Sequence, residues 1–254
     1  MKILGIDIGG SAVKGAPVDT TSGKLLAERV RIATDRPLTP LMMSRAVKDI
    51  ARQFQWRGPI GVGFPGVVRE GVTLTAANLH PRFVHCETRR LFAQATRCHV
   101  SLVNDADAAG LAEMRFGAGR RARGTVLLLT LGTGVGSALF FRGMLFPNSE
   151  LGHLPMKGDS AEKFIGAAAR KRRGLSWAKW GRELGGYIRT LERILSPELV
   201  IIGGGVSAKN AKFFHYVKHG VPMVPARFHN QAGIVGAALW AEVEHKPHRG
   251  RRAR

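Results

Sequence analysis

The sequence predicts a mixed α/β protein built as two lobes around a central cleft, with sheets flanked by helices. One observation is that a strand, a small-residue turn and a second strand occur twice, at residues 2–18 and 124–141. Another is that patterns of helical period separate these two units. Because tight hairpins join antiparallel strands, each sheet is expected to be mixed and not wholly parallel.

The first lobe is expected to span residues 1–103. The apolar run Lys2–Ile8 stops at a glycine turn and resumes at Ala12–Val18, which predicts a hairpin, and a third strand is expected around Leu25–Ile32. A helix should begin at Pro40, where proline suits the first helical position. Its apolar face has helical spacing: Met43, Val47, Ile50 and Phe54.

The second lobe is expected to span residues 104–231. An alanine-rich helix should run from Asp105 to about Phe116, and strands should flank the second glycine turn. A long amphipathic helix should begin after Ser176, and its stripe is Trp177, Trp180, Leu184, Tyr187, Leu191 and Ile194. A last helix, at about 232–244, is expected to pack back on the first lobe, and the basic residues 245–254 should form a disordered tail.

The charge of the chain is unusual. Its 254 residues contain 39 Lys and Arg against 18 Asp and Glu, a net charge of +21. The tail supplies five of these positive charges and no acid, so the excess also belongs to the folded body. Such a body attracts polyanions, including nucleic acids, acidic membrane surfaces and phosphate chains, although solubility or host adaptation accounts for the charge equally well.

The cellular location is expected to be the cytoplasm. The sequence contains no apolar stretch of membrane-spanning length, and its first residues lack the order of a signal peptide. Cys86 and Cys98 are its only cysteines, which indicates neither a disulfide framework nor a cysteine-rich metal motif.

Three glycine turns follow strands, at Asp7–Ser11, Gly132–Gly136 and Gly203–Gly205. Glycine lets successive backbone N–H groups approach an anion, and although a single such turn is usually a plain hairpin, three together predict phosphate binding. Asp7, which only accepts hydrogen bonds, is expected to hold Mg²⁺ through water. The other expected phosphate-binding residues are Gly9, Gly10, Ser11, Lys14, Thr130, Gly132, Thr133, Gly134, Gly204 and Gly205.

These turns and two further segments together resemble the ROK family of sugar kinases. Residues 7–15 resemble its first phosphate loop, residues 131–136 its second, residues 104–108 its catalytic segment and residues 150–153 its sugar-binding segment. The likeness extends from about residue 3 to residue 243. Four further stretches resemble the polyphosphate-using branch of the family: residues 75–79, 174–177, 196–207 and 230–239.

The resemblance implies a two-lobed, actin-like ATPase fold of the ribonuclease H-like class and a homodimer. It also implies a kinase that makes glucose 6-phosphate, with Mg²⁺ and with polyphosphate, ATP or both as donor. Asp105 would be the general base that takes the proton of the sugar's 6-hydroxyl. The residues that would hold the sugar are Asn78, Asn104, Asp105, Glu150, His153 and Glu162. Such a set suits a hexose, whose hydroxyls both donate and accept hydrogen bonds.

Four of these residues also have a structural interpretation. Asp105 suits the first turn of a helix, where the helix dipole favours a carboxylate, and Asn104 suits its N-cap. His153 suits a structural role, and Glu162 suits a solvated helix surface. The cations expected to contact polyphosphate are Lys14, Arg82, Arg120, Arg121, Arg123, Arg170, Lys171, Arg172 and Arg173. The last four form a run before Gly174 that equally suits a solvated basic face.

The chain departs from the family pattern in ways that bear on function. No cysteine follows Cys98, so the structural zinc site of many relatives is not expected, and no helix-turn-helix precedes the first glycine turn. His80–Phe83 replaces an acidic residue and a tryptophan of the polyphosphate-using branch, which leaves glucose and mannose both open as substrates. Two alternatives remain: an ATP-only hexokinase, and a basic nucleic-acid-binding protein on a kinase-like scaffold. The sequence contains few aromatic residues on which bases could stack, which argues against the nucleic-acid-binding alternative.

Overall fold

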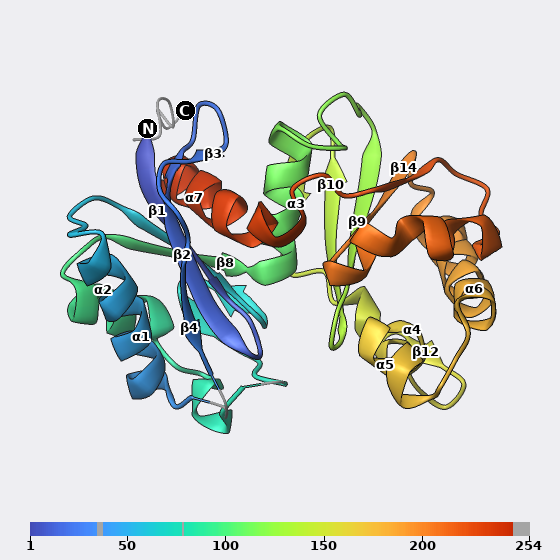
Figure 1. The fold of residues 1–254 in the computed structure, drawn as a ribbon, viewed down its shortest axis with the longest axis horizontal. Coiled ribbons are helices and arrows are strands. Elements are labelled where there is room, and N and C mark those ends of the chain that lie inside the picture. The colour runs from blue at the N-terminus through green and yellow to red at the C-terminus, as the bar shows by residue number, and fades with distance from the viewer. Residues whose placement is uncertain (35–37, 78, 246–254) are drawn as a thin grey trace, which may run out of the picture. The chain divides into compact units, whose positions relative to one another are not determined.

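The computed structural model describes residues 1–34, 38–77 and 79–245. The chain forms two compact units (Figure 1): Met1–Ala108 together with the C-terminal helix from Gly233, and Ala109–Ala232. These boundaries lie close to those expected from the sequence, at 103/104 and 231/232. That the units are the two lobes of a kinase stays a prediction.

A six-stranded mixed sheet forms the centre of the first unit. Its strands are β1 (Lys2–Ile8), β2 (Ala12–Asp19), β3 (Lys24–Leu25), β4 (Val30–Ala33), β5 (Ile60–Phe64) and β8 (Val100–Asn104). The order is β3-β2-β1-β5-β8, and β4 also pairs with β2. Because β1, β5 and β8 are parallel, their carboxyl ends meet at one edge, which brings Asp7 and Asn104 to the same side of the sheet.

The prediction of a single strand around Leu25–Ile32 is wrong. The structure has two short strands there, β3 and β4, and both are antiparallel to β2. The two strands pair with opposite ends of β2, on either side of Pro17. Proline has no N–H to donate, so the chain leaves the ladder there, and only the amide of Leu26 reaches the Pro17 carbonyl, at 2.8 Å.

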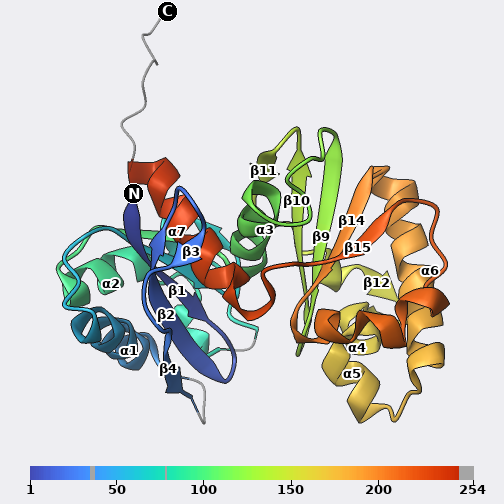
Figure 2. The ribbon, with the colours of Figure 1, turned by 45° about the horizontal axis from the view of Figure 1, so that its top comes forward.

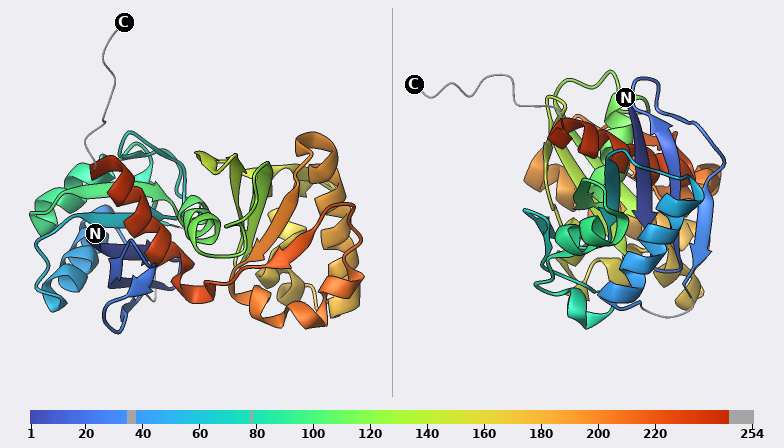
Figure 3. Two further views of the ribbon diagram at one scale, coloured as in Figure 1. Left: turned by 90° about the horizontal axis from the view of Figure 1, so that it is seen from above. Right: turned by 90° about the vertical axis from the view of Figure 1, so that its left-hand side faces the viewer.

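Helices cover both faces of this sheet (Figure 3). On one face, α1 (Pro40–Gln53) and α2 (Thr88–Thr96) share a core with the apolar side chains of β1, β5 and β8. On the other, α7 (Ala232–His245) approaches the strands so closely that a Cβ at Gly5 would lie 2.0 Å from a backbone oxygen of the helix. A Cβ at Gly61 would lie 1.9 Å from another. The two glycines therefore permit this packing.

A five-stranded sheet of order β11-β10-β9-β14-β15 forms the second unit (Figure 2). Its strands are β9 (Thr125–Leu131), β10 (Val135–Phe141), β11 (Met144–Phe146), β14 (Leu199–Gly203) and β15 (Met223–Pro225). The predicted β9–β10 hairpin is present, and β14 runs parallel to β9. The carboxyl ends of β9 and β14 therefore bring the second and third glycine turns to one edge.

The long helix α6 (Trp177–Leu195) packs on this sheet through Trp180, Leu184 and Ile188. Ser176 caps it as predicted, and its hydroxyl accepts the amide proton of Lys179. The expected burial of Ile194 is wrong, because its side chain is 59% exposed. At 100° per residue the buried stripe is centred near Leu184 and Ile188, and Ile194 lies about a quarter turn away from that centre.

Shorter elements connect these parts. The helix α3 (Asp105–Arg115) follows β8 and crosses from the first unit into the second. The remaining elements are β6 (Val68–Arg69), β7 (Val72–Thr73), η1 (Pro81–Phe83), η2 (Leu151–His153), β12 (Pro155–Met156), β13 (Asp159–Ser160), α4 (Glu162–Ile165), α5 (Ala167–Arg172), η3 (Gly205–Lys212), η4 (Phe214–Tyr216) and η5 (His229–Gln231).

Two expectations concern residues that the structure leaves undescribed. Asn78, an expected sugar ligand, lies outside the described residues, and so does the tail from residue 246 onward. His245, the first residue of the expected tail, is helical and ends α7. Within the described part of the chain, no helix has the length and apolar character needed to cross a membrane.

Candidate active site

The first glycine turn joins β1 to β2. The Gly9 amide donates to the Ala12 carbonyl at 2.9 Å and closes the turn, while the Ser11 carbonyl accepts the Thr34 amide at 3.0 Å. A Cβ built on Gly10 would meet no heavy atom within 4 Å, so the backbone there faces open space. The turn is thus fixed at its ends and accessible at its tip.

Asp7 lies at the end of β1 beside this turn. Lys14 Nζ is 3.9 Å from its Oδ2. Burial raises the pKa of the Asp7 carboxyl, and the charges of Lys14 and Arg29 oppose that rise. The start of α7 also reaches this carboxylate, because a Cβ at Gly233 would lie 2.7 Å from its Oδ1. No sequence pattern indicated a role for Arg29, which comes from the segment between β3 and β4.

Asn104 and Asp105 lie where β8 passes into α3. Asn104 is buried, and its Oδ1 accepts the amides of Ala106 at 2.8 Å and Asp107 at 3.0 Å. Its Nδ2 donates to the Gly66 carbonyl at 3.2 Å. The residue therefore caps α3, as its structural interpretation expects, and its contact with a sugar stays a prediction. The Asp105 side chain is partly buried, and its Oδ1 accepts the Ala106 amide at 2.8 Å.

The second glycine turn joins β9 to β10. The Gly132 amide donates to the Gly134 carbonyl at 3.0 Å, and the Gly132 carbonyl accepts the Ala168 amide of α5 at 3.0 Å. A Cβ on Gly132 would again face open space. The Glu162 carboxylate packs against the turn: its Oε2 accepts the Val135 amide at 3.4 Å, and a Cβ on Gly134 would lie 2.3 Å from that oxygen.

Three expected sugar ligands gather beside this turn. His153 Nε2 lies 3.5 Å from Glu150 Oε2. Burial raises the pKa of the Glu150 carboxyl, His153 lowers it, and the nearby negative charge of Glu162 raises it further. Glu150, His153 and Glu162 thus share one electrostatic environment. Glu162 is not the solvated helix residue of its structural interpretation, because it contacts the turn.

The segment that carries Glu150 and His153 is held from two sides. Ser137 on β10 donates to the Ser149 carbonyl, and its Oγ accepts the Leu151 amide at 3.0 Å. The Tyr187 hydroxyl on α6 donates to the Leu151 carbonyl at 2.7 Å. In the sequence, Tyr187 stands only as one member of the apolar stripe of its helix, and no pattern indicates this contact.

The third glycine turn lies against the second. Gly204 has φ +78°, and a Cβ there would lie 2.6 Å from the Leu131 carbonyl oxygen, at the end of β9. Only glycine combines this backbone conformation with so close an approach. The Ser207 hydroxyl donates to the Gly204 carbonyl at 2.8 Å, whereas the Cβ position of Gly205 is open. Two accessible turns therefore stand side by side in the second unit.

Two cations of the basic run before Gly174 have structural partners. The Arg170 guanidinium stacks 3.9 Å from the centroid of Trp177 and donates to the Leu175 carbonyl at 2.8 Å. Arg173 pairs bidentately with Glu183 at 2.6 and 3.0 Å. For these two, the interpretation as a solvated basic face is wrong, because planar guanidinium groups favour stacking and paired carboxylate contacts. The exposed candidates are Arg82, Arg120, Arg121, Arg123, Lys171 and Arg172.

The fold and these turns define a sugar kinase-like protein, and comparison with known proteins places it in a family. A model of the ROK family matches residues 3–169, and the chain belongs to the ROK family. The expected family is therefore confirmed.

Particular relatives are closely similar. The polyphosphate glucokinase of Mycobacterium tuberculosis (strain CDC 1551 / Oshkosh) is 42% identical over 93% of this chain and 89% of its own. That of Mycobacterium leprae is 40% identical over 95% and 76%. The inorganic polyphosphate/ATP-glucomannokinase of Arthrobacter sp. strain KM is 43% identical, with a TM-score of 0.93 over 96% of this chain and 99% of its own. These matches confirm the predicted actin-like ATPase fold.

Proposed function

We propose that this protein is a hexose kinase that transfers the terminal phosphoryl group of inorganic polyphosphate, or of ATP, to the 6-hydroxyl of glucose. The observation that carries the proposal is the gathering of Glu150, His153 and Glu162 beside an accessible glycine turn. The names of the similar proteins from Mycobacterium and Arthrobacter support the reaction and both donors.

The sugar would be held by the groups that gather at the second turn. Carboxylates accept hydrogen bonds from hydroxyls, and the imidazole of His153 can donate or accept, so together they match neighbouring hydroxyls of a pyranose. A site that bonds each hydroxyl discriminates strongly against sugars that lack one, because its own buried polar groups are then left unpaired. Asn78 and Asn104 complete the proposed set.

Asp105 would act as the general base. It is the first residue of α3, at the same sheet edge as Asp7, and it is partly buried. An ionised carboxylate in this position can take the proton of the 6-hydroxyl as the oxygen attacks phosphorus. In phosphoryl transfer, the protein contributes mainly such positioning of the reactants and neutralisation of their charge.

The phosphate groups would be bound at the accessible glycine turns. The open Cβ positions of Gly10, Gly132 and Gly205 leave room for oxygens next to backbone N–H groups. Ser11, Thr133 and Lys14 would add donors. The Asp7 carboxylate fits Mg²⁺, which usually keeps several waters and binds one or two carboxylates besides the substrate phosphates. When bound, the ion would neutralise charge on the phosphoryl oxygens.

Polyphosphate would be the preferred phosphoryl donor, and ATP would be a second donor. A net charge of +21 favours a polyanionic donor, whose screened attraction to Lys and Arg adds along the chain. A homodimer and a cytoplasmic location stay predictions, as does the choice between glucose and mannose.

The test is a coupled hexose 6-phosphate assay with glucose and mannose, each with polyphosphate and with ATP. Asp105→Asn should lower kcat at least about a hundredfold, because it removes the base while keeping the shape of the side chain. The matched control is Asp49→Asn on the exposed face of α1, which should retain activity. Full activity of Asp105→Asn would overturn the mechanism, and nucleic-acid binding without any transfer would favour the alternative scaffold function.

A further inference from the structure

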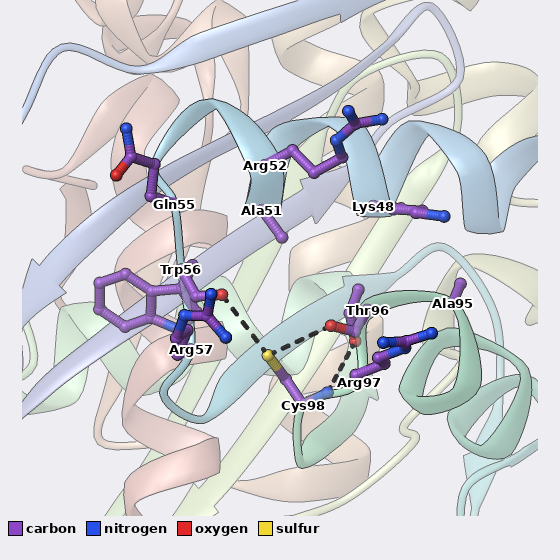
Figure 4. A pocket seen from close by; sticks show the side chains of 10 residues that line it. All are labelled: Lys48, Ala51, Arg52, Gln55, Trp56, Arg57, Ala95, Thr96, Arg97 and Cys98. Atoms are coloured by element: carbon purple, nitrogen blue, oxygen red, sulfur yellow. Dashed lines mark hydrogen bonds between the residues drawn. The ribbon is translucent and has the colours of Figure 1, made fainter.

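The first unit contains a basic pocket that the proposed reaction does not use (Figure 4). It has a volume of about 780 Å³ and lies between the carboxyl-terminal ends of α1 and α2. Four cations line it: Lys48, Arg52, Arg57 and Arg97. Cys98 lies at its floor, where the thiol donates to the Trp56 carbonyl at 3.8 Å and to the Thr96 carbonyl at 3.6 Å.

The pocket is strongly positive. It contains no carboxylate, and within the described part of the chain none of its four cations forms an ion pair. Two helix C-termini lie nearby, and each carries about half a negative charge. They would offset roughly one of the four cations, which leaves a net charge of about +3. Compensation of the helix dipoles therefore does not account for all four side chains.

The pocket lies far from the proposed catalytic edge. Arg57 and Cys98 precede β5 and β8, whereas Asp105 follows the opposite end of β8. At about 3.3 Å per residue, the five residues of β8 separate these ends by roughly 17 Å. A phosphate bound in the pocket is thus distinct from one being transferred, and only a long ligand can occupy both places.

We propose that this pocket binds an inner stretch of an inorganic polyphosphate chain whose terminal phosphate is at the catalytic turns. This inference rests on the proposed donor. Several cations along an open pocket match a ligand with a charge on each repeating unit. Anchoring the chain at a second point raises the effective concentration of its end at the catalytic turns, so long chains are better donors than short ones.

A nucleic acid fits the pocket less well. Single-stranded nucleic acids gain much of their affinity by stacking bases on exposed aromatic rings. The pocket has one aromatic residue, Trp56, and its indole N–H donates to the Pro59 carbonyl at 3.0 Å while its ring packs against the core of the unit. The pocket thus offers charge without a stacking platform.

The two cysteines allow a test that needs no turnover. Cys98 lines the pocket, Cys86 does not, and both are partly buried. Labelling by N-ethylmaleimide would be followed by mass spectrometry with and without long-chain polyphosphate. The bound chain should slow labelling of Cys98 at least about fivefold and leave Cys86 unaffected, because reactivity follows access to the thiol. Equal effects on both cysteines would overturn the proposal, as would equal protection by a single-stranded oligonucleotide of matched charge.

A pair of variants tests the charge directly. The variant Lys48→Gln/Arg52→Gln removes two pocket cations. The control, Lys24→Gln/Arg193→Gln, removes two exposed cations elsewhere, and Arg193 matches Arg52 because each lies in the last turn of its helix. The pocket variant should lower the ratio of kcat/KM for long-chain polyphosphate to that for tripolyphosphate about tenfold. It should also weaken the salt dependence of long-chain binding. The slope of log K against log salt should become about 1.4 less steep, because each of the two lost contacts contributes about 0.7.

The control variant should retain both values, and identical behaviour of the two variants would overturn the proposal. The outcome is separable from that of the proposed function. If the protein transferred no phosphate, labelling of Cys98 would still report whether the chain binds in this pocket.

Discussion

The hydroxyl of Tyr187, on α6, donates a 2.7 Å hydrogen bond to the carbonyl of Leu151, between Glu150 and His153. The helix α6 thereby fixes the backbone of the segment that carries two proposed sugar ligands. Burial raises the pKa of the Tyr187 phenol well above its ordinary value, so the group remains a donor at every pH of interest.

Tyr187→Phe should therefore loosen the sugar site without removing a ligand. Loss of one hydrogen bond should lower the free energy of unfolding by about 1 kcal/mol and raise KM for glucose up to about fivefold, with little change in kcat. Tyr216→Phe, at the other tyrosine, is the matched control because its hydroxyl forms no hydrogen bond within the part of the chain that the structure describes. Denaturant unfolding would measure the stability of each variant, and steady-state kinetics its KM. A KM of Tyr187→Phe equal to that of the wild type would contradict the prediction.

Gly152 should be intolerant of substitution because it packs on β10. A Cβ there would lie 2.2 Å from the Val135 carbonyl oxygen, so Gly152→Ala must displace the segment from the glycine turn. We expect it to cost about 2 kcal/mol or more of folding stability and to raise KM for glucose. Gly186→Ala is the control: its nearest neighbour is 3.9 Å away on a helix, where alanine should be neutral or stabilising. Wild-type kinetics in Gly152→Ala would refute this packing argument.

Asn104→Ser separates capping from substrate binding. Serine also caps helices but cannot replace the bond from Nδ2 to the Gly66 carbonyl, so the free energy of unfolding should fall by about 1 kcal/mol. The shorter side chain cannot reach a sugar as the amide would, and KM for glucose should rise about tenfold. Thermal unfolding gives the first value and the coupled assay the second. An unchanged KM would leave Asn104 as a helix cap alone.

Features whose cause is local could be predicted from the sequence. The hairpin that turns just after Asp7 and the glycine turn at Gly132 follow from apolar runs broken by glycine, and both are present. Contacts between particular side chains could not be predicted in the same way. Arg170 and Arg173 stand in a basic run, which suggested solvent exposure, whereas each binds a residue of α6, seven and ten positions further along the chain. The pocket near Cys98 likewise depends on two helix ends that are far apart in sequence.

The Arg173–Glu183 pair should make part of the stability of the second unit depend on pH. Hydrogen bonds from Arg173 lower the pKa of Glu183 from 4.5 to about 2, with a smaller contribution from Lys157. An acid whose pKa is depressed in the folded state stabilises it above the unfolded pKa, and this contribution is lost as the pH falls toward the folded value. The loss should therefore extend from about pH 4.5 to about pH 2.

Glu183→Gln should lower the free energy of unfolding by about 1 kcal/mol at pH 7, after allowance for solvent screening, and the difference from the wild type should shrink as the pH falls below 4.5. Glu87→Gln is the control, because its pair with Arg90 is largely exposed and should contribute little at any pH. Urea unfolding at a series of pH values from 7 to 3 measures both variants. A difference for Glu183→Gln that stayed constant over this range would show that the carboxylate charge does not stabilise the fold, and that Arg173 is held by its carbonyl and aromatic contacts with Phe164 instead.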